Sequence, residues 1–423
     1  MQDRGKIGIR LGRPRMARTM AKKTGKPSTD ARADARTARK NAVRRGALAG
    51  EHAGEHAGEH AAERVSEPAR EPLAELLTAW FRSAARDLPW RRTRDGYRAL
   101  VSELMLQQTQ VSRVVEKFEP FIARFPTPAA LAAASEDEVL TAWQGLGYYR
   151  RARLLHAAAK AVVARHGGEV PSDAEALRAL PGVGRYTSGA VSSIVFGARE
   201  PIVDGNVTRV FQRVEARAGS ASDGDVQAWA WERAEAFVAA AREPSVANEA
   251  LMELGATVCT PAAPRCGECP LRACCRAHAE ARVDEIPAPK TRVARKDLVL
   301  VAACLRRADG AVLLEQRPRE GMWGGLWAGL WQPPTVESAD GADLAPRAAG
   351  ELLGLPASVA LAAVGEVPFM TTHRAVRFVV FAATVRGAGN ALAVGGRRWV
   401  APDELGEFAL SNAAKKVLAS ARV

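Results

Sequence analysis

Two hydrophobic periodicities divide the chain. Between Pro72 and about residue 285, apolar positions recur three and four residues apart, as on the buried face of an amphipathic helix. From Asp297 onward, apolar residues form short runs typical of strands. This change of period predicts a multidomain chain, in which an all-α domain is followed by a smaller α+β domain.

The individual elements follow from the same pattern. Helices are expected over Leu73–Ala85, Leu100–Phe118, Glu136–Leu146 and Arg151–Arg165, and strands over Asp297–Arg306, Ala311–Gln316, Val376–Thr384 and Arg397–Val400. Residues 343–354 are expected to form a helix among these strands. The proline-rich run from Ile286 has the composition of a linker. The predicted domains are therefore residues 72–285 and 297–423, joined by a linker over 286–296.

Residues 1–71 lack periodicity and are predicted to form a disordered tail. Residues 1–45 hold 15 Lys and Arg against three Asp and Glu, so +12 of the net charge of +13 lies there. The basic character of the chain is thus weak evidence for nucleic-acid binding by its folded part. A Glu-His-Ala-Gly repeat follows from Glu51, for which a low-complexity linker is favoured over a metal site.

The cysteines indicate a metal group. Five of the six fall between residues 259 and 275, and no signal peptide is apparent, which indicates metal binding rather than a disulfide framework. The spacing contains a single Cys-x2-Cys pair, which favours an iron–sulfur cluster over zinc. The expected ligands are Cys259, Cys266, Cys269 and Cys275, and Cys274 competes for the fourth position.

A glycine turn precedes an expected helix in the middle of the chain. Gly182, Val183, Gly184 and Arg185 follow Pro181, and glycines at a helix start let backbone N–H groups approach a phosphate closely. The alternative is an ordinary helix–helix turn. The cysteine array downstream favours phosphate binding.

Acidic and amide residues in apolar surroundings are candidates for chemistry. Glu103 lies in an apolar helical segment, where it either faces solvent or occupies a pocket that raises its pKa. Asp204 and Asn206 flank a glycine, as a helix N-cap or a held carboxylate would. Gln107, Gln108 and Thr109 offer donors and acceptors to bases or backbone.

A second turn combines glycines with aromatic and basic side chains. Leu146, Gly147 and Tyr148 precede two arginines, and such a turn suits insertion into a base stack with phosphate contacts beside it. A helix C-cap with core tyrosines would have the same pattern.

Taken in order, these segments match one family. Residues 72–285 resemble the MutY-type adenine DNA glycosylases, which belong to the helix-hairpin-helix superfamily and carry an iron–sulfur cluster. The resemblance is carried by seven segments: Leu88–Arg91, Val101–Thr109, Gly145–Tyr149, Gly182–Thr187, Val203–Val207, Asn248–Gly255 and the four cysteines. It implies a base excision repair enzyme that flips adenine out of A:8-oxoguanine or A:G mispairs in double-stranded DNA and hydrolyses its bond to the sugar.

The resemblance also implies residue roles. Glu103 would protonate the adenine, Asp204 would stabilise the cationic sugar, and Tyr186 and Asn206 would line that site near Glu249. Tyr186 stands where the related endonuclease III family has a Schiff-base lysine, which implies a monofunctional enzyme. The implied contacts with DNA are made by Gln107, Gln108, Thr109, Leu146, Gly147, Tyr148, Gly182, Val183, Gly184 and Arg185, and the implied cofactor is a [4Fe–4S] cluster.

Residues 297–423 resemble the Nudix-like C-terminal domain of the same family. Pro346–Gly354 lacks the acid cluster with which a hydrolysing Nudix box binds Mg²⁺, so no nucleotide hydrolysis is expected. The resemblance implies 8-oxoguanine recognition by Thr372 and His373, although an aromatic residue often stands where Thr371 is.

Two other functions were weighed. A bifunctional endonuclease III-like glycosylase and AP lyase is disfavoured by Tyr186, and a non-catalytic iron–sulfur DNA sensor by the intact Glu103 and Asp204. No run of about 18 apolar residues occurs, so no membrane association is expected. A monomeric, cytoplasmic protein of the bacterial nucleoid is the expectation.

Overall fold

The computed structural model describes residues 70–289, 294–318, 327–339, 344–386 and 389–422. The predicted tail, with its histidine repeat, lies outside the described residues except at its last two positions, and so do residues 290–293 of the predicted linker. The described residues belong to one compact unit. No helix in the described ranges is both long and apolar enough to cross a membrane.

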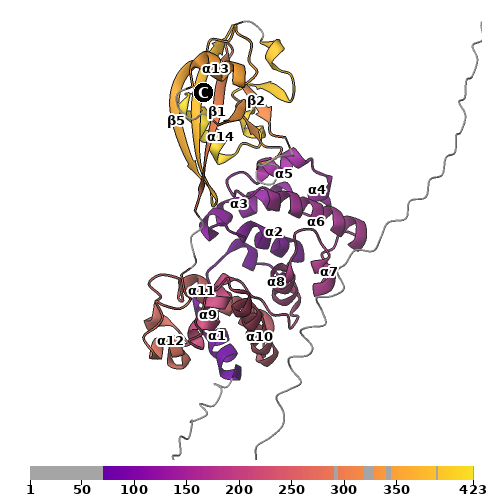
Figure 1. Cartoon of the computed structure of the whole chain (residues 1–423). Helices are drawn as coiled ribbons and strands as arrows, with labels where there is room; N and C mark the ends of the chain where they lie inside the picture. The colour runs from indigo at the N-terminus through magenta and orange to yellow at the C-terminus, as the bar shows by residue number, and fades with distance from the viewer. Residues whose placement is uncertain (1–69, 290–293, 319–326, 340–343, 387–388, 423) are drawn as a thin grey trace, which may run out of the picture. The chain divides into compact units, whose positions relative to one another are not determined.

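The first part of the described chain is helical and is termed the helical lobe (Figure 1). Its helices are α1 (Arg70–Ala84), α2 (Gly96–Leu106), α3 (Val111–Arg124), α4 (Pro128–Ala133), α5 (Glu136–Ala142), α6 (Arg150–His166), α7 (Ala174–Arg178), α8 (Arg185–Phe196), α9 (Gly205–Val214), α10 (Gly224–Ala240), α11 (Pro244–Thr257) and α12 (Arg276–Ala279). The helices expected over 73–85 and 151–165 are confirmed as α1 and α6. The capping box at Ser135 and Glu138 opens α5.

Two predicted helices were wrong in extent. Residues 100–118 form α2 and α3 with a break between them, because Gln107 leaves the helical region and Gln108 adopts a left-handed φ of 55°. The apolar period continues across the break because both helices bury side chains in one core. The helix expected over 136–146 ends at Ala142, since Gly145 and Gly147 have φ values of 95° and 70°.

The helical lobe has two apolar cores. One core joins α2 through α8, and its largest fully buried side chains include Phe118, Phe121 and Trp143. The other joins α1 to α9, α10 and α11 around residues such as Leu77 and Leu251. The chain therefore returns its first helix to the second core, and α8 of one core packs against α11 of the other.

The remainder, termed the sheet lobe, is built on one seven-stranded sheet. The strands are β1 (Lys296–Arg307), β2 (Val312–Gln316), β3 (Trp331–Gln332), β4 (Thr335–Ser338), β5 (Ala362–Met370), β6 (Arg374–Val385) and β7 (Arg397–Val400). Their order is β3-β2-β1-β6-β5, with β4 on β1 and β7 on β2. β1 and β6 are parallel, with Val301 opposite Val379, and the other pairs are antiparallel.

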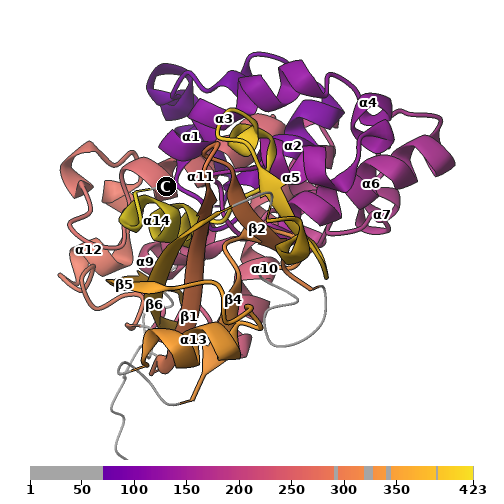
Figure 2. The same cartoon turned by 90° about the horizontal axis from the view of Figure 1, so that it is seen from above.

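Both faces of β1 are buried, which explains its nearly continuous apolar sequence. Val301 and Leu305 pack with α13 (Pro346–Leu352), whereas Leu300 and Cys304 pack with α14 (Asn412–Ser420). Figure 2 shows the two helices on opposite sides of the strands. The predicted α+β class is confirmed, but the sequence pattern missed β3, β4, β5 and α14.

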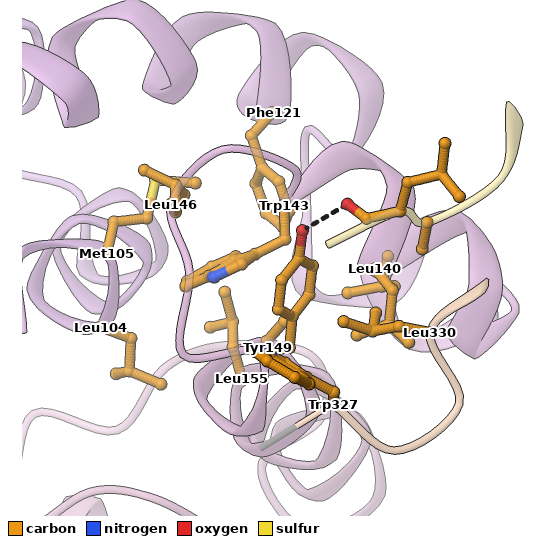
Figure 3. Packing of buried hydrophobic residues seen from close by; sticks show 14 of the residues in the cluster. Leu104, Met105, Phe121, Leu140, Trp143, Leu146, Tyr149, Leu155, Trp327 and Leu330 are labelled. Carbon is orange, nitrogen blue, oxygen red and sulfur yellow. Dashed lines mark hydrogen bonds between the residues drawn. The ribbon is translucent and has the colours of Figure 1, made fainter. Parts of the chain in front are cut away.

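The α14 face of the sheet shares its core with the helical lobe. Trp143 and Tyr149 lie near Trp327 and Leu330 of the sheet lobe, as Figure 3 shows. The Tyr149 hydroxyl donates a hydrogen bond of 3.2 Å to the Leu410 carbonyl. The turn between α5 and α6 is thereby held against the sheet lobe.

Candidate functional site

A cavity of about 820 Å³ opens where the two helical cores meet. Its walls come from α2, α8, α9 and α11 and from the 3₁₀ turn Pro89–Arg91. It brings together eleven of the residues singled out from the sequence: Glu103, Gln107, Gln108, Thr109, Gly182, Gly184, Arg185, Tyr186, Asp204, Asn206 and Glu249. Leu88, Trp90, Ala99, Leu106, Ile194 and Met252 supply apolar walls.

Glu103 is buried in α2 and is 8% exposed, so the alternative of a solvent-facing side chain was wrong. Burial raises its pKa to about 7, an interaction with the Tyr186 hydroxyl lowers it, and the carboxylates of Asp204 and Glu249 raise it further. Its Oε2 atom is buried and has no hydrogen-bond partner among the described residues. Near neutral pH, the cavity thus contains a carboxylic acid that is partly protonated and free to donate.

Asp204 is the N-cap of α9, as its pattern allowed. Its Oδ1 accepts a hydrogen bond from the Val207 N–H (2.7 Å), and its Oδ2 accepts one from Asn206 Nδ2 (3.0 Å). Burial raises the pKa of Asp204, and these hydrogen bonds oppose the rise. The two carboxyl groups of Glu103 and Asp204 therefore have different surroundings within one cavity, an arrangement that separates acid from base roles.

A second layer of charges lies near Glu103, and of its members the sequence indicated Glu249 but not its arginine partners or Glu253. Glu249 lies 3.3 Å from Arg91 and 2.6 Å from Arg94, measured between side-chain oxygen and nitrogen atoms. One turn further along α11, Glu253 accepts hydrogen bonds from Arg86 and Arg91. Two glutamates four residues apart in an apolar helix were the available signal, because buried carboxylates need cationic partners.

The glycine turn leads into α8 as expected. Gly182 has a φ of 79°, and a β-carbon there would lie 2.6 Å from Leu154, so only glycine fits. Gly184 is the N-cap, and no side chain caps the first turn of α8. The N-terminal amides of this helix, at the rim of the cavity, have the geometry of an anion site.

Two neighbouring turns each hold a non-glycine residue in the left-handed region. Gln108 has a φ of 55° and Tyr148 a φ of 48°. Such backbone costs about 1–3 kcal/mol per residue and is concentrated at functional sites. Tyr148 is 38% exposed, and its hydroxyl lies 3.2 Å from Thr372 Oγ1 on the exposed turn between β5 and β6, which also carries His373.

Other predicted DNA contacts lie away from the cavity. Leu146 and Val183 are buried at 4% and 6% exposure, so their side chains do not face solvent. Gly147 is half-buried and its carbonyl accepts a hydrogen bond from Trp143 Nε1. Leu146 is visible in Figure 3 beside Met105 and Trp143, in the core.

Four cysteines line a second, smaller cavity beyond α11. They are Cys259, Cys266, Cys269 and Cys275, and the Cys274 thiol instead donates to the Leu271 carbonyl. Burial raises the pKa of Cys269 to about 11, and the thiolates of its neighbours contribute to the rise. Arg213 Nη1 lies 3.4 Å from Cys259 Sγ, so one buried cation faces the group.

The cysteine arrangement does not match a single ion. No three His, Cys, Asp or Glu side chains of the described residues are grouped as they would be around one metal ion. A zinc ion holds its sulfur ligands at about 2.3 Å and draws them together, whereas a four-iron cluster is itself several atoms wide. Four thiols that line one cavity are a donor set that fits a cysteine-held metal group.

Two family models match the chain. The model of the HhH-GPD superfamily of base excision DNA repair proteins matches residues 101–236, and the model of the NUDIX domain matches residues 301–420. The first covers α8, α9 and most of α2 at the large cavity but not α11, and the second covers nearly the whole sheet lobe. Together with the site, these matches place the chain among base excision DNA repair proteins that carry a Nudix domain.

Similarity to individual proteins identifies the family within this class. The chain is 36% identical over 396 residues to an adenine DNA glycosylase of Rattus norvegicus, covering 81% of this chain and 76% of the relative. Those of Homo sapiens and Mycolicibacterium smegmatis are 45% and 46% identical over 219 and 203 residues, covering 50% and 47% of this chain and 40% and 67% of theirs. The chain belongs to the adenine DNA glycosylase family.

The two kinds of buried glutamate predict opposite effects of pH on stability. The pKa of Glu103 is raised from its ordinary value of 4.5, which applies to the unfolded chain, to about 7. The contribution of Glu103 to the free energy of unfolding is therefore complete below pH 4.5 and is lost as the pH rises through 7. Relative to the wild type, Glu103→Gln should therefore gain unfolding free energy between pH 5 and pH 8, on the order of 3 kcal/mol.

Glu253→Gln is the matched control. Burial disfavours the Glu253 carboxylate, but Arg86 and Arg91 outweigh burial and lower its pKa. The stabilisation that the ionised Glu253 gives the folded state is present above its pKa in the unfolded chain and is lost in acid. Glu253→Gln should therefore have a lower free energy of unfolding than the wild type at pH 7, and the difference should shrink at low pH. Denaturant unfolding at several pH values measures both. A Glu103→Gln difference that does not change with pH would contradict the raised pKa.

Proposed function

We propose that the chain is a monofunctional adenine glycosylase acting on A:8-oxoguanine and A:G mispairs in double-stranded DNA. The observation that carries the proposal is the buried Glu103 carboxyl, with a pKa of about 7 and an unpartnered oxygen, in a cavity shared with Asp204. A base must leave the helix to reach such a cavity. The volume and apolar walls suit a planar base with its sugar.

Glu103 is the proposed general acid. A protonated carboxyl whose Oε2 lacks a partner can donate to a ring nitrogen of the extruded adenine, which makes the base a better leaving group. A pKa near 7 maintains a substantial protonated fraction at neutral pH. Arg91 and Glu249, at the back of the same cavity, offer a donor and an acceptor to the edges of the base.

Asp204 is the proposed carboxylate facing the sugar. Two hydrogen bonds and its position at the start of α9 support its ionised form, which stabilises the positive charge that develops as the base leaves. Asn206 positions Asp204, and Tyr186 interacts with Glu103 between the two acids. The leaving base thus takes a proton from one carboxyl while the other faces the sugar.

The absence of an amine supports a monofunctional enzyme. Schiff-base formation with the sugar needs a deprotonated amine, and none of the described residues lining the cavity is a lysine. Tyr186 occupies the position directly after Gly-Val-Gly-Arg and cannot form an imine. These observations favour hydrolysis over the lyase alternative.

The DNA-binding surface is proposed to surround the cavity. The uncapped start of α8 at Gly184 and Arg185 suits a backbone phosphate, and Gln107–Thr109 lines the opening. The Gly147–Tyr148 turn lies next to Gln107–Thr109, because Thr109 Oγ1 donates a hydrogen bond to the Leu146 carbonyl. Tyr148 contacts Thr372, which supports a role for Thr372 and His373 opposite the adenine. Domain limits near 72–285 and 297–423 are proposed from the change from helices to strands along the chain.

A [4Fe–4S] cluster is the proposed cofactor. Cys259, Cys266, Cys269 and Cys275 would hold it, since their thiols surround one cavity beside the Arg213 guanidinium. When bound, such a cluster supplies a rigid cross-link for the loop after α11. Arg209 ties this loop to the site by donating to the Cys259 carbonyl (2.8 Å) and to Asn206 Oδ1 (2.9 Å).

A single-turnover assay tests the catalytic proposal. An end-labelled duplex with adenine opposite 8-oxoguanine should be cut at the adenine only after alkali, with an excision rate that falls as pH rises through about 7. Glu103→Gln should lose at least about 100-fold of that rate, because the proton donor is removed. Glu232→Gln, at an exposed position of α10, is the control and should retain it.

The other outcomes separate the alternatives. Strand cleavage without alkali would identify lyase chemistry. Tight binding to the duplex with no product would favour the non-catalytic sensor. Equal excision from an A:T duplex would contradict the mispair preference while leaving the glycosylase activity in place.

The cofactor proposal is tested by paired cysteine variants. Cys275→Ser should lose most of the bound iron and the visible iron–sulfur absorbance of protein purified without oxygen, because it removes a ligand. Cys274→Ser should keep both, since Cys274 bonds to a carbonyl and does not line the cavity. Equal iron contents in the two variants would contradict the assignment of Cys275 as a ligand. Zinc in place of iron would favour a zinc site.

A further inference from the structure

Arg151, near the start of α6, makes an unusual set of contacts. Its side chain is buried, and Nη1 donates hydrogen bonds to the carbonyls of Leu104 (2.6 Å) and Met105 (2.7 Å). Nη2 donates to Thr109 Oγ1 (2.9 Å) and to the carbonyls of Leu146 (3.2 Å) and Gly147 (3.1 Å). One guanidinium thus joins three segments that are separate in the sequence.

Each of these segments belongs to the site or to its rim. Leu104 and Met105 are in the last turns of α2, directly after Glu103. Thr109 ends the first rim turn, defined here as Gln107–Thr109, and Leu146 and Gly147 belong to the second rim turn, Gly145–Tyr148. The tips of both rim turns, Gln108 and Tyr148, have left-handed backbone that side-chain-bearing residues rarely adopt. The backbone preferences of these two residues therefore do not by themselves keep either turn in its conformation.

Among the described residues, no carboxylate accepts a hydrogen bond from Arg151. All five acceptors are neutral oxygens, and the guanidinium lies 5.4 Å from the Trp143 ring centroid and 5.5 Å from that of Tyr148. Burial without an ionic partner is unfavourable for a cation. A planar guanidinium with donors fixed in a fork is suited to several fixed acceptors, whereas a lysine ammonium is not.

We infer that Arg151 is a positioning residue, which sets the two rim turns relative to each other and to the helix end that carries Glu103, so that they act together on the DNA. The inference rests on the proposed function, since it takes the rim turns as parts of the DNA interface. Arg151 would act in the extrusion of the adenine, without contacting the base.

The test compares Arg151→Lys with Arg199→Lys in the full chain. Arg199 also donates to carbonyls, those of Val238, Ala239 and Ala241 at the end of α10, and lies outside the cavity lining. Base extrusion is followed by the fluorescence of 2-aminopurine placed opposite 8-oxoguanine in a duplex. Melting temperature and affinity for undamaged duplex are measured beside it.

Arg151→Lys should slow the rise in fluorescence and the excision of adenine at least 10-fold, with affinity for undamaged duplex within about threefold of the wild type. Arg199→Lys, at a similar melting temperature, should extrude and excise at the wild-type rate. Equal extrusion by Arg151→Lys and the wild type, or an equal loss in Arg199→Lys, would overturn the inference.

If Arg151→Lys does not fold, two milder substitutions at Thr109 allow the same test. Thr109→Val removes one acceptor of the guanidinium and should slow extrusion more than Thr109→Ser, which keeps the hydroxyl. Equal rates in both would overturn the inference. If the wild type itself gives neither fluorescence change nor excision, the proposed function fails, and that result is distinct from a loss confined to the Arg151 variant.

Discussion

The burial of Glu103 beside two other carboxyl groups is the constraint on which the site depends. Like charges in one desolvated cavity cannot all be ionised without compensation. Glu249 is compensated by Arg91 and Arg94, and Asp204 by two hydrogen bonds at the start of α9. Glu103 has the Tyr186 hydroxyl and the charge of Arg91 against these effects, and they do not outweigh burial, so its pKa rises to about 7. Different surroundings thus distinguish Glu103 from the compensated carboxyls of Asp204 and Glu249.

The fold produces this constraint by bringing two cores together. α2 delivers Glu103 from the first core, and α9 and α11 deliver the other acids from the second. Close packing fixes their distance, since a β-carbon at Gly255 of α11 would lie 2.7 Å from the β-carbon of Asn206. Arg209 then connects α9 to the cysteine loop. The loop is therefore part of the support of Asp204, even though it lies outside the cavity.

The sequence could predict whatever depends on residue type and local period. α1 and α6 follow from helical spacing, and the glycines, acids and cysteines are visible as motifs. The break after Gln107 could not be predicted, because it contains no Gly or Pro and Gln108 is held in place by contacts such as that between Thr109 and Arg151. The pairing of Arg91 with Glu253 joins residues 162 positions apart, and only the fold reveals it. The short strands β3 and β4 likewise depend on pairing with partners already in the sheet.

The most direct test of this account is the titration of Glu103 itself. Carbon-13 labelling of the glutamate side-chain carboxyls lets their ionisation be followed by NMR in the full chain, and Glu103→Gln identifies the resonance. One carboxyl resonance should titrate near pH 7 and disappear in the variant. If every glutamate, Glu103 included, titrates below about pH 5, near its ordinary value, the site holds only anions and has no general acid at this position.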